Sequence, residues 1–347
     1  MSLTSLPDTV KVSRGTAGSD RRSLLLRLDL PVMAVIVVVF IGLALLADSN
    51  YWSRILTSVA ILGAASTGWN ILGGYAAQLS LGHAAFFGLG MYGVAIVFGE
   101  HEMSPWLGIA AGIAASVIVA LLIGAPTFRL SGHYFALGTL AVLQVFLILA
   151  TVIPSLTGGA QGIYLPLRGE AYNLIFEDQR NYLYVGLVVL VIALVVAAVV
   201  RRSKLGVQLD AIRLNEAAAS LSGVNVFHAK MKAFVLSAAI ASLAGSAYMT
   251  LVQFVDPPSG FAWNTTLNLV LFAIVGGMRF WWGPLLGAAI LVPLEEVTKS
   301  QFTGNMVAVG DIVFGVLLIL FVILQPRGIG GALVSLGRGL RRKERAA

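Results

Sequence analysis

The chain has 347 residues, of which 58% are hydrophobic and only 11% are charged, and its mean hydropathy is +0.89. Soluble domains carry about 25% charged residues, so this composition excludes an ordinary soluble protein and indicates an integral membrane protein. The absence of cysteine excludes disulfides, thiolate nucleophiles and cysteine-based metal sites.

The basic excess and the histidines indicate neither nucleic acid nor metal. The formal net charge is +7, but the lysines and arginines lie at the ends of apolar runs, as topology signals do in membrane proteins. The histidines are scattered, and none has the spacing of metal ligands; they are His83, His101, His133 and His228. We therefore expect no metal site and no nucleic-acid partner.

Apolar runs long enough to cross a bilayer recur along the chain. The first lies at residues 30–47, and an uncleaved span is favoured over a cleaved signal peptide because no clear A-x-A site is present. Further runs lie at 55–72, 79–98, 105–125, 134–153, 182–200, 233–253, 265–277, 284–297 and 312–324. This pattern predicts an all-α polytopic membrane protein with about ten transmembrane helices. The runs at 265–277 and 284–297 are short, which indicates broken or re-entrant helices.

The distribution of lysine and arginine predicts the orientation of these spans. With both termini in the cytoplasm, 19 of the 23 basic residues fall inside and four outside, in agreement with the positive-inside rule. The chain then divides into a cytoplasmic N-terminal segment (1–29), a transmembrane domain (30–325) with a cytoplasmic loop at 201–232, and a basic cytoplasmic tail (326–347). Five spans in each half are compatible with inverted repeats, and a single unrepeated bundle is the alternative.

One glycine-rich span begins with polar side chains. The segment at 73–93, GGYAAQLSLGHAAFFGLGMYG, contains Gln78, Ser80 and His83 among glycines that allow helices to approach closely or to break. Two interpretations remain open at this point. The segment is either a kinked helix that lines a pathway or a tightly packed helix with a polar start.

The chain lacks the groups that would power transport by itself. Ion-coupled carriers place ionisable groups inside the membrane, whereas the acidic residues here lie near predicted span ends; these are Glu295, Glu296 and Asp311. No G-x-x-x-x-G-K-[ST] motif occurs, and the glycine-rich stretch at 157–162 lacks the following Lys-Ser/Thr. We therefore expect no nucleotide hydrolysis in this chain. The loop at 154–181 is either a solvated connector or a docking site for an external partner.

The cytoplasmic loop at 201–232 is the longest polar stretch between apolar runs, and it carries six basic residues. Apolar residues recur there with the period of one α-helix face; they are Val207, Ala211, Leu214, Ala218 and Leu221. Gly223 follows as a C-terminal stop, so the pattern predicts a single surface helix of about four or five turns. This helix either docks on a partner protein or rests on the lipid surface, and its weak apolar face favours a protein.

Several motifs occur in the same order as in a known family. The segment at 206–247, with AIRLNEAAASLSGVNVFHAKMKAFVLSAAIASLAGSA, resembles the cytoplasmic loop and following helix of branched-chain amino-acid ABC transporter permeases. The same resemblance holds for QLSLGHAAFFGLGMYG (78–93), RLSGHYFALGTLA (129–141), LTGGAQGI (156–163), VDPPSGF (255–261) and IVGGMRFWWGPLLGA (274–288). One departure is Arg279-Phe280-Trp281-Trp282, where the family usually has another small residue, and this leaves the substrate open.

The resemblance implies a permease subunit of an ATP-driven importer for branched-chain or other apolar amino acids in a bacterial inner (plasma) membrane. The implied partners are two cytoplasmic ATPase subunits that use ATP and Mg²⁺, a second related permease and an extracytoplasmic binding protein. In this family the segment from Glu216 to Gly223 corresponds to the loop that docks on the ATPase. The implied coupling residues are Arg213, Asn215, Glu216, Ala217, Ala218 and Gly223.

For the translocation pathway we expect Gln78, Ser80, His83 and Tyr134, each of which also suits a packing role. Two alternative functions remain. A permease for urea, short amides or sugars would keep the architecture and change only the passage. An ion-coupled secondary transporter would need no ATPase.

Overall fold

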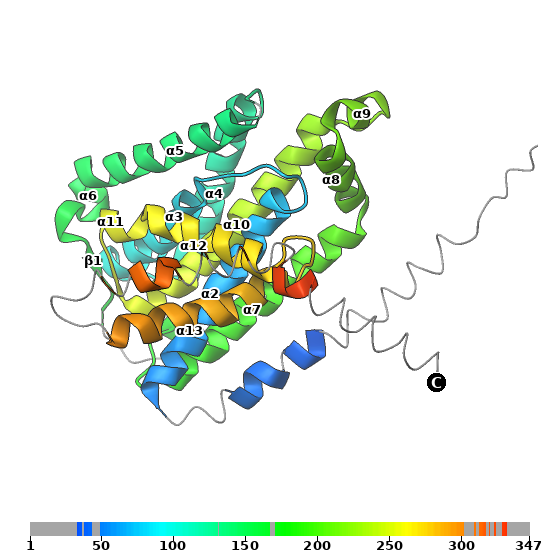
Figure 1. Cartoon of the computed structure of the whole chain (residues 1–347). Coiled ribbons are helices and arrows are strands. Elements are labelled where there is room, and N and C mark those ends of the chain that lie inside the picture. Colours follow the sequence, from blue (N-terminus) through cyan, green and yellow to red (C-terminus); the bar gives the residue numbers. More distant parts are fainter. Residues whose placement is uncertain are drawn as a thin grey trace, which may run out of the picture.

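The computed structural model of the chain describes residues 33–36, 38–43, 49–130, 132–166, 171–301, 309, 312–316, 319, 323 and 328–331. The predicted N-terminal segment (1–29) and most of the predicted tail (326–347) lie outside the described residues. The runs predicted at 30–47 and 312–324 are described only in part. The described chain is helical except for one two-stranded ribbon and its connecting loops (Figure 1).

Seven stretches of the described chain are long and apolar enough to cross a membrane. They are Asn50–Gly73 (α2), His83–Glu100 (α3, His83–Val94, and the π-helix η1, Ala95–Glu100), Pro105–Thr127 (α4), His133–Val152 (α5), Gln179–Arg202 (α7), Val226–Val252 (α10) and Pro257–Gly276 (α11, Pro257–Gly260, and α12, Trp263–Gly276). The prediction of an all-α polytopic membrane protein is confirmed, whereas the predicted count of ten helices is not reached among the described residues.

The two short runs predicted near the C-terminal end form helices of different kinds. Helix α12 has 14 residues, fewer than the roughly 20 that span the hydrocarbon core, and the preceding α11 extends it to the 20-residue stretch Pro257–Gly276. The run predicted at 284–297 is a longer helix, α13 (Gly283–Gln301). It carries Glu295, Glu296 and Lys299, so its last turns are polar.

Helices α2 and α10 form the centre of the molecule. Helix α10 packs against α2, α3 and α4, and α2 also packs against α7, α12 and α13. The apolar window of α2 is 83% buried, whereas those of α4 and α5 are 28% buried, which leaves α4 and α5 to face lipid. A Cβ at Gly90 would overlap the Ser242 carbonyl, and one at Gly245 would overlap the Phe87 carbonyl. Glycine therefore lets the backbones of α3 and α10 touch, as small residues do in membrane helix packing.

The molecule has two distinct ends (Figure 1). At one end, β1 (Ile163–Tyr164) pairs antiparallel with β2 (Phe254–Val255), close to α11 and α6 (Pro154–Thr157). We call this the ribbon end. The described residues of the loop predicted at 154–181 form α6, β1 and the 3-10 turns η2 (Gly159–Gln161) and η3 (Ala171–Asn173). At the opposite end, which we call the α8–α9 end, lie α8 (Lys204–Leu214) and α9 (Glu216–Leu221).

Candidate functional site

The predicted surface helix is in fact two helices that meet at Asn215. This residue has extended backbone angles of φ −162° and ψ 112°, and its Oδ1 accepts a hydrogen bond from the backbone N of Ala218 at 3.0 Å. Asparagine is among the most favourable residues at a helix N-terminus because its side chain bonds a free N–H there. The prediction of one continuous helix is wrong. The helical spacing of the apolar residues continues past Asn215, but the helix itself ends there and a new one begins.

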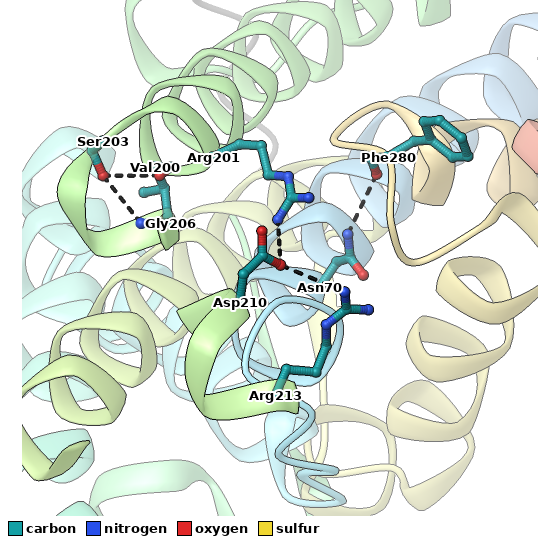
Figure 2. A network of polar contacts seen from close by, with 8 residues as sticks. All are labelled: Asn70, Val200, Arg201, Ser203, Gly206, Asp210, Arg213 and Phe280. Carbon is teal, nitrogen blue, oxygen red and sulfur yellow. Dashed lines mark hydrogen bonds and ion pairs between the residues drawn. The ribbon is translucent and has the colours of Figure 1, made fainter. Parts of the chain in front are cut away.

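Side-chain caps also set the other boundaries of this segment. The Ser203 hydroxyl donates to the Val200 carbonyl at 2.8 Å and accepts from the Gly206 N–H at 3.4 Å, so α7 turns directly into α8 (Figure 2). Gly223 follows α9 with φ +84°, a left-handed conformation that glycine adopts with little strain. The Asn225 side chain then caps the start of α10. These caps therefore set where α8, α9 and α10 begin and end.

The two short helices leave an apolar face uncovered. Leu209 and Ile212 are buried against the rest of the chain. Val207, Leu214 and Leu221 are instead 54%, 81% and 92% exposed, and we call these three residues the apolar face. They are the three large residues of the predicted stripe, two on α8 and one on α9, and nothing in the described part of the chain covers them. Large apolar side chains exposed together mark an interaction surface.

Asp210 of α8 lies between two arginines (Figure 2). Its Oδ1 is 2.8 Å from Arg201 Nη1, at the end of α7, and 3.6 Å from Arg213 Nη2. The Arg201 guanidinium also lies over the ring of Tyr75, 5.2 Å from the centroid. Burial raises the pKa of the Tyr75 phenol more than the neighbouring Arg201 lowers it, so the ring stays neutral. These contacts join α7 and α8 to the segment that follows α2.

The segment that departs from the family pattern lies beside this network (Figure 2). Asn70 of α2 donates its Nδ2 hydrogen to the Phe280 carbonyl at 3.5 Å. The Phe280 ring stacks on Trp282 with centroids 4.9 Å apart, and Trp281 is buried. Arg279 is exposed. The bulky aromatic residues are therefore accommodated inside the protein at the α8–α9 end.

Glu216 forms an ion pair with a lysine of α10. The Lys230 ammonium lies 2.7 Å from both carboxylate oxygens of Glu216. The Lys230 side chain is 4% exposed and that of Glu216 is 52% exposed, so the cation is the member that has lost its water. A buried charge is tolerated when it is paired and hydrogen-bonded, and Glu216 provides both. This pair attaches α9 to α10.

Sequence reasoning missed Lys230, although a signal was present. The residue lies in the first turns of a long apolar helix, where an ionisable side chain is a functional-site hypothesis by default. In one continuous helix the fourteen residues between Glu216 and Lys230 would separate them by about 21 Å, so the sequence spacing alone does not reveal the contact. The ion pair exists because the turn at Gly223 folds α9 back toward the start of α10.

The structure places the predicted coupling residues in different environments. The side chains of Arg213 and Glu216 bind partners in this chain, and Asn215 caps α9. Ala217 and Ala218 are exposed. The outward surface of this segment includes the apolar face and these alanines together with the partly exposed Glu216.

The residues predicted for the pathway do not share one environment. The ring nitrogens of His83 lie 2.8 Å from Ser80 Oγ and 2.6 Å from Ser237 Oγ. Ser237 donates its own proton to an α2 carbonyl at 2.7 Å, so His83 must be the donor to Ser237. This buried network holds α2, α3 and α10 together. Gln78 is half-buried, and Tyr134 is 70% exposed at the start of α5.

Comparison with known proteins gives consistent relatives. The chain is 27% identical over 285 residues to the high-affinity branched-chain amino acid transport system permease protein LivM of Salmonella typhimurium, covering 76% of this chain and 66% of that relative. It is 28% identical over 287 residues to LivM of Escherichia coli, with the same coverage. It is 24% identical over 282 residues to the permease protein LivH of Salmonella typhimurium, covering 76% of this chain and 89% of LivH.

The chain thus spans 66% of the length of the LivM relatives. No solved structure matches it. The model of one family, described as "Branched-chain amino acid transport system / permease component", matches residues 51–322. Because this match includes six of the seven candidate spans and nearly all of the seventh, as well as the whole α8–α9 segment, the chain belongs to the branched-chain amino acid transport system permease family.

Proposed function

We propose that this chain is a membrane-spanning subunit of an ATP-driven ABC importer that carries branched-chain or other apolar amino acids across a bacterial inner membrane. Family membership and seven candidate spans support a membrane transport subunit. The observation that carries the ATP-driven part is the uncovered apolar face on α8 and α9. The positive-inside distribution of basic residues assigns the α8–α9 end to the cytoplasm, where ATP is available.

An ATPase subunit is the partner that suits the apolar face. Helices that bind membrane surfaces present a large apolar side, whereas α9 has six residues and Asn215 interrupts the helix before it. Short helices with a few apolar anchors instead suit a groove in a partner protein. ATP and Mg²⁺ would be bound by that partner, because this chain contains no phosphate-binding loop motif.

The ion pairs behind the apolar face connect it to the spans. Glu216 and Lys230 attach α9 to α10, and Asp210 attaches α8 to Arg201 at the end of α7. Helix α10 packs against α2, α3 and α4, so a displacement of α8 and α9 reaches the centre of the bundle. Binding of ATP by the partner changes access only by favouring one of two packed arrangements of these helices.

Two further partners complete the proposed importer. Salmonella typhimurium has both a LivM and a LivH that match this chain, which supports a second, related permease and hence a heterodimer. We infer that an extracytoplasmic binding protein delivers the substrate at the ribbon end, since that end lies opposite α8 and α9 (Figure 1).

Reconstitution with these partners in vesicles tests the proposal. Labelled leucine uptake is expected to require ATP and to survive collapse of the proton gradient. The variant Leu221→Asp places a charge on the apolar face and should lower both ATPase binding and uptake by tenfold or more, equivalent to about 1.4 kcal/mol. Leu156→Asp is the matched control for ATPase binding alone, because Leu156 is a 52% exposed leucine on α6 at the ribbon end, where the binding protein is inferred to dock.

Two outcomes would reject the proposal. Uptake that follows the proton gradient without ATP would identify a secondary carrier. ATP-driven uptake of urea, amides or sugars, with none of leucine, isoleucine or valine, would identify the other class of ABC permease.

A further inference from the structure

A cavity of about 440 Å³ opens among α2, α3, α10, α12 and α13, in the half of the molecule nearer the ribbon end. Its volume falls in the usual range for small-molecule sites, about 300–1,000 Å³. Its walls come from five separate helices and from β2 and α11 beside them. None of the residues predicted for the translocation pathway lines it.

One wall of the cavity is apolar. It is built by Leu62 of α2, Phe87 and Met91 of α3, and Val252 of α10. Phe87 and Met91 are each 2% exposed, so they are held in place by the packed centre of the bundle. This wall accommodates an aliphatic side chain.

A second part of the lining is a charged face of α13. Val292, Glu295, Glu296 and Lys299 all line the cavity, and their spacing of three, one and three residues places them on one face of the helix. Lys299 Nζ lies 2.6 Å from Glu295 Oε1. The second carboxylate oxygen of Glu295 accepts a hydrogen bond from Asn268 Nδ2 of α12 at 3.4 Å. The cavity is therefore lined by two carboxylates and one ammonium as well as by the apolar wall.

We propose that this cavity binds a zwitterionic α-amino acid with an apolar side chain; the inference rests on the proposed function and names its substrate site. The ligand ammonium binds the carboxylates of Glu295 and Glu296, and the ligand carboxylate binds the Lys299 ammonium. The side chain lies against Leu62, Phe87, Met91 and Val252. A zwitterion satisfies both signs of charge at once, because its ammonium pairs with the carboxylates and its carboxylate pairs with the Lys299 ammonium.

The same lining disfavours the other candidate substrates. Urea has no apolar part and would leave the apolar wall uncovered. A sugar has neither an ammonium nor a carboxylate, so it would leave Glu295, Glu296 and Lys299 without a charged partner in the ligand. The departure at Arg279–Trp282 lies at the α8–α9 end and contributes no residue to this cavity.

The test uses the full chain in lipid nanodiscs and labelled leucine as the probe. Competition by three groups of compounds separates the parts of the site: leucinamide lacks the carboxylate, 4-methyl-2-oxovalerate lacks the ammonium, and urea and glucose lack both. We expect saturable leucine binding. Each leucine analogue should compete at least tenfold more weakly than leucine, and urea and glucose should not compete.

Two substitutions assign the charged contacts. Glu295→Gln should weaken leucine binding about tenfold, and it should weaken 4-methyl-2-oxovalerate binding less, so that discrimination against the keto acid falls. Lys299→Gln should also weaken leucine binding. It should weaken leucinamide binding less, because leucinamide has no carboxylate for Lys299 to bind, so discrimination against leucinamide falls. A purely structural role would change all ligands alike. Glu177→Gln is the matched control, because Glu177 is an exposed glutamate of the outer loop that does not line the cavity.

The inference is overturned if the chain shows no saturable leucine binding, if both variants bind leucine as the unaltered chain does, or if urea and glucose compete equally with leucine. Uptake by the assembled transporter distinguishes this failure from failure of the proposed function. If the assembly imports leucine with ATP and both variants are unaffected, only the cavity assignment is wrong. If the assembly imports no apolar amino acid, the proposed function itself is wrong.

Discussion

Two ion pairs of the molecule differ in which partner is the more buried. In the Lys230–Glu216 pair at the α8–α9 end it is the cation, whereas in the Lys299–Glu295 pair of the cavity it is the anion. Lys230 is 4% exposed and its partner Glu216 is 52% exposed. In the cavity, Glu295 is 20% exposed and its partner Lys299 is 47% exposed. The two pairs have similar distances of 2.7 Å and 2.6 Å, so their geometry alone does not distinguish them.

Burial makes one pair permanent and the other exchangeable. If α9 moved away from α10, Lys230 would be left buried without an anion, which is strongly unfavourable; the two helices are therefore expected to move together. Lys299 can leave Glu295 for water or for a ligand carboxylate, since half-exposed ion pairs contribute little, and Glu295 keeps its contact with Asn268. The first pair suits a mechanical connection and the second suits a binding site.

Breaking the buried pair from its two sides should give unequal losses of stability. Glu216→Ala leaves the Lys230 ammonium buried and should destabilise the protein by about 2–3 kcal/mol, less than the roughly 3–5 kcal/mol of a fully buried pair because Glu216 is partly exposed. Lys230→Met leaves only a solvated carboxylate and should destabilise it by less than about 1 kcal/mol. Thermal unfolding in nanodiscs measures both.

The two single variants should lose leucine uptake to similar degrees, although their losses of stability differ. Either substitution removes the connection between α9 and α10, so each should lower the leucine transported per ATP hydrolysed. In the double variant that combines Glu216→Ala and Lys230→Met, stability should recover, whereas the leucine transported per ATP hydrolysed should stay low. Recovery of both would contradict the connection and leave the pair a purely structural one.

A side chain at Gly223 should disturb the turn between α9 and α10. The residue has φ +84° and no atom within 4 Å of a built Cβ, so Gly223→Val introduces backbone strain without a clash and should lower stability by about 1–2 kcal/mol. Gly132 is the matched control, since its φ is +57° and it is equally open. Gly132→Val should lower stability at least as much, because the ψ of −126° at Gly132 lies outside the left-handed region that other residues can enter. It should leave uptake per ATP unchanged, and an equal loss of uptake would contradict a specific role of the α9 turn.

Loss of the cap at Asn215 should have a smaller effect. Asn215→Ala removes the bond to the Ala218 N–H and should cost about 1 kcal/mol, whereas Asn215→Asp keeps an acceptor and should cost little. Helix α9 would fray in the first variant, so ATPase binding should weaken with it. Binding of the ATPase subunit to nanodiscs carrying each variant provides the measurement, and equal binding by both would show that α9 is held by packing alone.

The sequence predicted the spans well because hydropathy is a local property of the chain. The run predicted at 105–125 corresponds to α4 at Pro105–Thr127, and the run at 182–200 corresponds to α7 at Gln179–Arg202. Helix boundaries were less predictable where a single residue ends one helix and begins the next. The helical period of Val207, Leu214 and Leu221 continues across Asn215, and only the side-chain cap shows that the helix breaks there.

The candidate sites were predictable to unequal degrees. The α8–α9 segment carries contiguous sequence signals that predict a surface helix, but Lys230, the partner of Glu216, comes from the following helix and was missed. The cavity unites side chains from five helices, which no local pattern can reveal. One part of it was visible in principle. Val292, Glu295, Glu296 and Lys299 repeat with a helical period, but the expectation that a span ends near Glu295 hid the pattern.

The exchangeable pair should show the smallest change in stability. Lys299→Gln removes a half-exposed partner and should alter the stability of the ligand-free protein by no more than about 0.5 kcal/mol, far less than Glu216→Ala. Saturating leucine should raise the melting temperature of the unaltered chain, because a ligand that binds only the folded state stabilises it, and this increase should shrink in Lys299→Gln. A large loss of stability without leucine would show that Lys299 is as fixed as Lys230, and the contrast between the two ion pairs would then fail.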